Sequence, residues 1–214
     1  MTDERAERRW ERDPWQWSME GIRNHGNHIF VLPADDNDDK LDHNDIDVLM
    51  PLIAYAVEVL NSSRCIGWPL LKAIRKPEEL PDDIKRIEDR DGKHWVYPCI
   101  RVNCGSCGTA FGSTAVERFV SGPDKFRGSI SYARVKLDLD NLTESEPERL
   151  ACICHELGHA LGLPHYLGAY DDHHADTLEM MENECGALER NRDQYKLVVG
   201  EQTTQLLREL YPSG

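Results

Sequence analysis

The chain has 214 residues, with 39 acidic and 25 basic side chains and a formal net charge of −14 at pH 7. Apolar content is an ordinary 40%, and no stretch approaches the roughly 18–20 apolar residues that span a bilayer. Nucleic acids and anionic membranes are bound through basic surfaces, so this charge argues against both as partners. The acidic side chains are interpreted as a solvated surface.

Residues 1–27 are polar and arginine-rich and carry Trp10, Trp15 and Trp17. We expect an N-terminal extension whose tryptophans pack onto the surface of a domain that spans residues 28–214. The charged first residues are not followed by a hydrophobic segment, so we expect no secretory signal peptide. A cytoplasmic location is therefore expected. Secretion by another route, or a processed mature form, stays open.

The first half of this domain is predicted to hold strands and one long helix. An apolar run at 28–32, ending at Pro33, predicts a strand. Apolar residues at helical spacing predict a helix over 44–61, with Asn44 as its cap and Pro51 able to kink it. The further expectations are a strand at 68–74, a surface excursion at 77–92, a strand at 95–102, and a flexible loop at the glycines 105, 108 and 112.

The second half is predicted to hold a strand and two helices. Alternation at 130–139 predicts the strand, and apolar residues at helical spacing predict the helix that follows. Ser145, Pro147 and Glu148 suit a capping box at the start of that helix. After an irregular stretch at 164–186, a C-terminal helix is expected over about 191–211.

The helix after the 130–139 strand carries the spacing of a metal site, H-E-x-x-H-x-x-G-x-x-H at 155–165. His155 and His159 are one helical turn apart on one face, so both imidazoles can reach a single Zn²⁺. Gly162 can adopt a positive φ and end the helix, which returns the chain so that His165 becomes the third ligand. Glu156 is placed to touch a metal-bound water. Three protein ligands with an open fourth position are typical of catalytic zinc.

This motif is the signature of the metzincin zinc proteases, and residues 154–165 are most similar to the matrixin branch. The resemblance implies an α+β zincin catalytic domain with a mixed twisted sheet, a zinc cofactor and a protein or peptide substrate. It also implies a Met-turn beneath the metal, which Met180 or Met181 can supply; the sequence does not say which.

The function predicted from these residues is that of a zinc-dependent endopeptidase. Zinc would lower the pKa of its water to roughly 7 and polarise the peptide carbonyl, while Glu156 as general base passes the proton to the leaving amine. The strand at 130–137 precedes the zinc helix as the family's edge strand does, and it is expected to bind extended substrate unless it is an interior strand. Two alternatives are a catalytically silent or regulatory zinc-fold binding protein and a zinc hydrolase of non-peptide amides. The intact Glu156 argues against the silent protein.

Other clusters of ligand-type residues are ambiguous. Cys99, Cys104 and Cys107 suit half of a structural zinc site that Cys65 or Cys185 would complete, with free thiols or one disulfide as alternatives. The acidic run at 35–39 and the His/Asp run at 171–176 are interpreted as exposed loops. Cys152 and Cys154, just before His155, are expected to be small buried hydrophobic residues.

Overall fold

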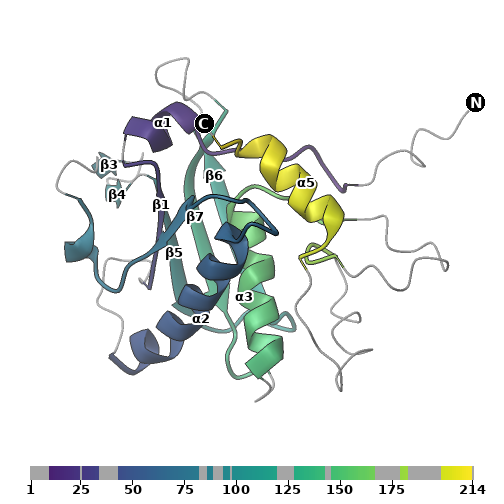
Figure 1. The fold of residues 1–214 in the computed structure, drawn as a ribbon. Helices are drawn as coiled ribbons and strands as arrows, with labels where there is room; N and C mark the ends of the chain where they lie inside the picture. Colours follow the sequence, from purple (N-terminus) through teal and green to yellow (C-terminus); the bar gives the residue numbers. More distant parts are fainter. Residues whose placement is uncertain are drawn as a thin grey trace, which may run out of the picture.

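The computed structural model describes residues 10–24, 26–33, 43–81, 86–88, 94–96, 98–119, 128–142, 146–166, 179–182 and 199–213. These residues form a mixed α/β structure, a five-stranded sheet with helices, which agrees with the predicted α+β class (Figure 1). No helix in these ranges is long and apolar enough to cross a membrane.

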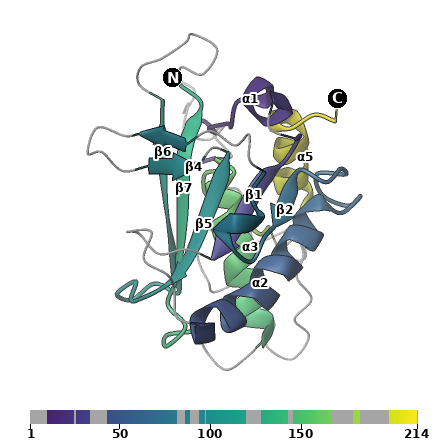
Figure 2. The same ribbon diagram turned by 90° about the vertical axis from the view of Figure 1, so that its left-hand side faces the viewer.

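The sheet has the strand order β2-β1-β5-β7-β6 and is parallel except at one edge. β6 runs antiparallel to β7, whereas every other neighbouring pair is parallel. Figure 2 shows β6 beside β7 at this edge. The strands are β1 Ile29–Pro33, β2 Leu71–Ala73, β5 Cys99–Cys104, β6 Gly112–Arg118 and β7 Ile130–Leu137.

The expectation that residues 130–137 form the edge strand is wrong, because β7 lies between β5 and β6. Alternation of apolar and polar residues marks a strand but does not say which neighbours it has. The edge is β6, whose first residue, Gly112, was expected in a loop. Residues along β6 alternate between more and less exposed, as in a strand with one face toward solvent.

Two long helices, α2 His43–Asn61 and α3 Glu146–Ala160, lie side by side on one face of the sheet (Figure 1). Helix α2 begins before Asn44, so this residue lies inside the helix rather than at its cap, and the helix continues past Pro51. The Asn61 side chain ties its end to β2, donating to the Leu71 carbonyl (2.8 Å) and accepting the Leu71 N–H (2.9 Å).

The core is divided by the sheet because side chains alternate along each strand. In β1, Ile29 and Val31 enter the main core between the sheet and the helices, whereas Phe30 and Leu32 enter a smaller cluster on the opposite face. The apolar residues predicted for the second helix form its buried face: Ile153, Leu157, Ala160 and Leu161 are buried, and Leu150 is half-buried.

Residues 95–102 were expected to form one strand and instead belong to two. Strand β4 (His94–Val96) pairs with β3 (Arg86–Glu88) in a separate hairpin, and β5 begins only at Cys99. Pro98 lies between the two strands, where its missing N–H cannot contribute to a ladder. The excursion at 77–92 therefore contains a strand as well as a short 3-10 helix, Pro77–Glu79.

The tryptophans of the N-terminal segment do not all lie on the surface, contrary to expectation. Trp17 is 0% exposed and belongs to the main core, while Trp10 and Trp15 are partly buried against it. Trp17 Nε1 donates to the Ala160 carbonyl (2.9 Å) at the end of α3. The Tyr211 hydroxyl accepts the Trp17 N–H (3.2 Å) and donates to the Leu161 carbonyl (2.7 Å). The N-terminal segment is thus joined to the end of α3, the helix with the histidine motif, and to Tyr211 near the C-terminus.

Two short helices complete the described fold, α1 Met19–Asn24 and α5 Glu201–Leu210. The described part of the predicted C-terminal helix begins at Glu201, after Gly200 with φ 87°. Several predicted features lie outside the described residues: the Ser145 cap, Cys185, residues 191–198, and the two polar runs at 35–39 and 171–176.

Candidate metal and catalytic site

The turn after α3 has the form that the motif predicts. Gly162 has φ 93°, its N–H bonds the His159 carbonyl (2.8 Å), and the Leu163 N–H bonds the Gly158 carbonyl (3.0 Å). This pair of bonds is a Schellman motif, which ends a helix and redirects the chain. A Cβ on Gly162 would lie 2.2 Å from the Trp15 carbonyl oxygen, so close packing also requires glycine here.

The turn brings the three histidines together. One ring nitrogen from each of His155, His159 and His165 lies within 4.8 Å of the others. His159 Nε2 and His165 Nε2 are 3.1 Å apart. Two nitrogens bound to one tetrahedral zinc at ~2.0–2.1 Å would be about 3.3 Å apart. The cluster therefore has the size of a three-histidine metal site.

The other ring nitrogen of each histidine is held by an oxygen. His155 Nδ1 donates to the Met180 carbonyl (2.7 Å), and His159 Nδ1 donates to the Leu163 carbonyl (2.8 Å). His165 Nδ1 lies 3.2 Å from a carboxylate oxygen of Glu11. A proton on Nδ1 leaves the Nε2 lone pair for a metal, so these contacts favour the tautomer that a metal ligand needs.

Glu11 is a site residue that sequence reasoning missed. The N-terminal segment runs along the ligand loop: the Glu11 N–H bonds the His165 carbonyl (3.0 Å), and the Trp15 N–H bonds the Gly162 carbonyl (2.9 Å). Trp10 forms an antiparallel bridge with Tyr166, and their rings pack edge to face. Nothing in the sequence pairs residue 11 with residue 165, because only the folded backbone brings them together.

Removing the Glu11 carboxylate is expected to weaken metal binding about tenfold, the low end of the range for carboxylates that orient a ligating histidine, because the Glu11 side chain is 54% exposed. Glu11→Gln should lose less metal affinity than Glu11→Ala, since the amide oxygen can still accept the hydrogen bond from His165 Nδ1. Competition with a chromophoric chelator measures both affinities. Asp13→Ala, an exposed carboxylate on the same segment, is the control; equal affinity in Glu11→Ala and wild type would remove Glu11 from the site.

Burial keeps two of the histidines neutral. It lowers the pKa of His155 to about 4 and that of His159 to about 3, and the charges of the neighbouring histidines act in the same direction. The Arg12 guanidinium adds to the lowering of the His159 pKa, which places a cation near the histidine cluster. Neutral imidazoles are the form that binds metal, so protons do not compete for these two nitrogens near pH 7.

These lowered pKa values make the stability of the metal-free protein depend on pH. Below about pH 6.5 the unfolded chain protonates His155 and His159, while the folded chain does not until the pH reaches about 4 or lower. The free energy of unfolding should therefore be largest above pH 6.5 and fall as the pH drops toward 4. Thermal melts between pH 7 and 5 check this, and a His155→Gln/His159→Gln variant should show a flatter dependence; an unchanged slope would contradict it.

Glu156 is enclosed by the start of the edge strand. Its side chain is buried, and the Thr114 hydroxyl lies 2.6 Å from Oε2 and 3.0 Å from the Glu156 carbonyl oxygen. A Cβ on Gly112 would lie 2.8 Å from Glu156 Oε1. Burial raises the pKa of Glu156 to about 7, against the opposing hydrogen bond from Thr114. A carboxyl group with such a pKa can accept and return a proton near neutral pH.

Gly112 and Thr114 are therefore further site residues that the sequence did not reveal. Their residue types suit a loop as well as a strand, and only the sheet shows that they face α3. The alternation of polar and small residues after Gly112 is a weak strand signal that could have found them.

Both predicted methionines lie against the metal-motif helix. A Cβ on Gly158 would lie 2.4 Å from Met181 Sδ and 3.0 Å from Met180 Cε, so glycine leaves the space that both side chains occupy. Met181 is fully buried, and the Met180 carbonyl holds His155. Both methionines thus lie beneath α3. The Met181 sulfur packs against Gly158, whereas Met180 packs there with its side chain and also accepts the His155 hydrogen bond with its carbonyl.

The methionine segment is fixed by Glu179. Its buried carboxylate accepts the N–H groups of Gln202 (2.9 Å) and Thr203 (3.0 Å) and the Thr203 hydroxyl (2.8 Å), which caps the N-terminus of α5. The Met180 N–H bonds the Val199 carbonyl (3.1 Å), and the Tyr166 N–H bonds the Met181 carbonyl (2.7 Å). Helix α5 and the ligand loop therefore hold this segment from two sides.

The cysteines do not form a second centre within the described chain. Cys99 faces the small cluster, whereas Cys104, an odd number of residues further along β5, packs against the main core on the opposite face. The six described cysteines are free thiols, with Cys152 and Cys154 buried as expected. Among the described residues, the three histidines are the one group that could hold a metal ion.

Comparison with known proteins finds no matching family model and no matching curated sequence. The family resemblance therefore stays a prediction that rests on the motif at 155–165.

Proposed function

We propose that this chain is a zinc-dependent endopeptidase in which His155, His159 and His165 hold the metal and Glu156 is the general base. The observation that carries the proposal is the histidine cluster, with each Nδ1 held by an oxygen, together with the buried carboxylate of Glu156, which comes directly after His155 on α3. Three imidazoles form a donor set that zinc favours, and catalytic zinc sites with three protein ligands keep a fourth position for water or substrate.

The chain's own residues would then move one proton. When bound, zinc polarises a carbonyl and acidifies water. Glu156 accepts a proton as the oxygen of water bonds to the peptide carbonyl carbon, and it returns that proton to the amine nitrogen as the C–N bond breaks. The raised pKa of Glu156 suits both transfers near neutral pH.

The edge strand β6 is the proposed platform for a protein or peptide substrate. An extended peptide can add to a sheet edge through backbone hydrogen bonds, and β6 is the edge nearest Glu156, since Gly112 and Thr114 contact its carboxylate. A peptide on β6 would pass beside the general base. This role was assigned to residues 130–137 from the sequence, and it moves to β6 because β7 is an interior strand.

The test is hydrolysis of a mixed peptide library by the purified protein, with and without a chelator and after zinc is restored. Chelator-sensitive cleavage that zinc restores is the expected result. Binding of peptides without cleavage would favour the catalytically silent binding protein. Cleavage of non-peptide amides but not of peptides would favour the zinc hydrolase of non-peptide amides. Cleavage that a chelator does not affect would contradict the proposal.

A further inference from the structure

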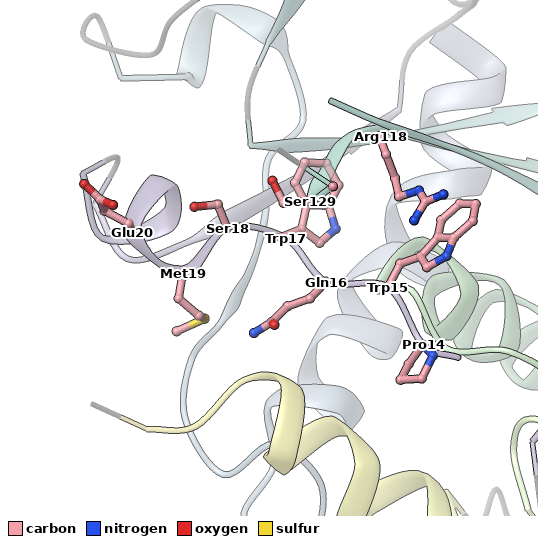
Figure 3. A pocket seen from close by; sticks show the side chains of 10 residues that line it. Pro14, Trp15, Gln16, Trp17, Ser18, Met19, Glu20, Arg118 and Ser129 are labelled. Carbon is pink, nitrogen blue, oxygen red and sulfur yellow. The ribbon is translucent and has the colours of Figure 1, made fainter. Parts of the chain in front are cut away.

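Two arginines share one tryptophan beside the candidate site. The guanidinium carbons of Arg12 and Arg118 each lie 4.3 Å from the centre of the Trp15 ring system. Figure 3 shows the Arg118 guanidinium beside the Trp15 ring. Arg118 is the last residue of the edge strand β6, and Arg12 follows Glu11, whose carboxylate contacts His165. Two distant parts of the chain thus bring two cations to one indole.

Within the described chain, neither guanidinium has a carboxylate partner, and the buried Nη1 of Arg12 has no hydrogen-bond acceptor. Glu11 is engaged with His165, and the side chains of Asp13 and Glu117 are exposed beside the two arginines without an ion pair to either. In a chain with a net charge of −14, two cations on one ring that have no carboxylate partner among the described residues are unusual. Each guanidinium carbon lies 4.3 Å from the ring centre, so the two are separated by at most twice that distance, and an anion beside the ring would be attracted by both charges.

The pair is also placed along the proposed substrate path. Arg118 lies four residues after Thr114 on β6, which corresponds to about 13 Å at the usual strand rise. Arg12 is near enough to the ligands to act on the charge of His159. Beside Trp15 and Arg118 lies an open hollow of about 500 Å³, which Gln16, Met19 and Ser129 also line, with the Glu20 carboxylate on its wall as well (Figure 3).

We propose that Arg118, held by Trp15 at the end of β6, binds the carboxylate of an acidic side chain in a peptide substrate that lies along β6, and that Arg12 on the same ring adds positive charge. The planar guanidinium matches a carboxylate in two parallel hydrogen bonds, which gives position as well as attraction. The acidic residue would lie about four positions from the cleaved bond, on its N-terminal side if the peptide runs antiparallel to β6. This inference rests on the proposed endopeptidase function and assigns it a substrate class.

The experiment uses the zinc-loaded 214-residue chain and fluorogenic peptides in which a single glutamate is moved through the five positions on each side of the cleaved bond, each paired with its glutamine counterpart. At one position, three to five residues from the bond, the glutamate peptide should have about tenfold higher kcat/KM, as expected for a charge-assisted hydrogen bond. The preference should shrink at high salt. Arg118→Gln should reduce it to less than twofold, and Arg118→Lys should keep only part of it.

Arg75→Gln, which removes an arginine on the α2–β2 side of the molecule, is the matched control and should leave the preference intact. Two outcomes would overturn the inference and leave the endopeptidase function standing. One is cleavage of neutral peptides with no glutamate preference at any position, and the other is a glutamate preference that survives in an Arg12→Gln/Arg118→Gln variant. If no peptide is cleaved, calorimetric titration of the same peptides decides: tighter binding of the glutamate peptide that is lost in Arg118→Gln supports the subsite, and equal binding overturns it.

Discussion

Replacing Glu156 with glutamine is expected to abolish nearly all peptide hydrolysis while the fold and the bound zinc remain. A positioned general base contributes ~10²–10⁴-fold to rate, so kcat should fall by at least two orders of magnitude. Glutamine has nearly the same volume and can still accept the hydrogen bond from Thr114, so the packing against Gly112 should survive. Single-turnover assays on a peptide found in the library, together with metal analysis and circular dichroism, check the three parts of this result.

Thr114→Val is the matched control for Glu156→Gln. It removes the hydroxyl that contacts the carboxylate but leaves the base itself, so it should lower kcat much less and move the acidic limb of the pH–rate profile upward, because a hydrogen bond that lowers the pKa of Glu156 is lost. Wild-type turnover in Glu156→Gln would show that another group is the base, and the mechanism proposed above would be wrong.

The second large effect concerns the metal itself. The purified protein is expected to hold one equivalent of zinc, and His159→Ala is expected to lose it, because two remaining imidazoles bind zinc far more weakly than three. His28→Ala, which removes a histidine outside the cluster, should keep the full equivalent. Atomic absorption after gel filtration measures the stoichiometry.

Zinc should also stabilise the protein, because a metal that binds only the folded state adds free energy of unfolding, about 2.7 kcal/mol at a free concentration of 100 Kd. A chelator should therefore lower the Tm of the wild type but not that of His159→Ala. Stoichiometric zinc in a variant lacking all three histidines would refute the assignment. A second equivalent in the wild type is not expected, since Cys99 and Cys104 face opposite sides of β5.

The sequence by itself determined the local parts of the site. His155 and His159 share a helix face because four residues make about one turn, and Gly162 ends that helix because it accepts a positive φ. The third histidine follows within three residues, so the cluster needs almost no tertiary information. The long helix after β1 was predicted in the same way, since a buried helix face leaves a periodic apolar pattern in the chain.

Only the tertiary structure decided which distant residues meet this helix. Glu11 reaches His165 through backbone pairing, Thr114 and Gly112 reach Glu156 because β6 closes the edge of the sheet, and Arg118 meets Arg12 on Trp15. Strand order places β6 rather than β7 at that edge. Such contacts depend on how elements pack, and a side chain's type does not record which residue it meets 42 positions away, as between Thr114 and Glu156, or further. The histidine cluster follows from local helical geometry, whereas the groups that hold these histidines, enclose Glu156 and form the proposed substrate strand follow from the sheet and the N-terminal segment.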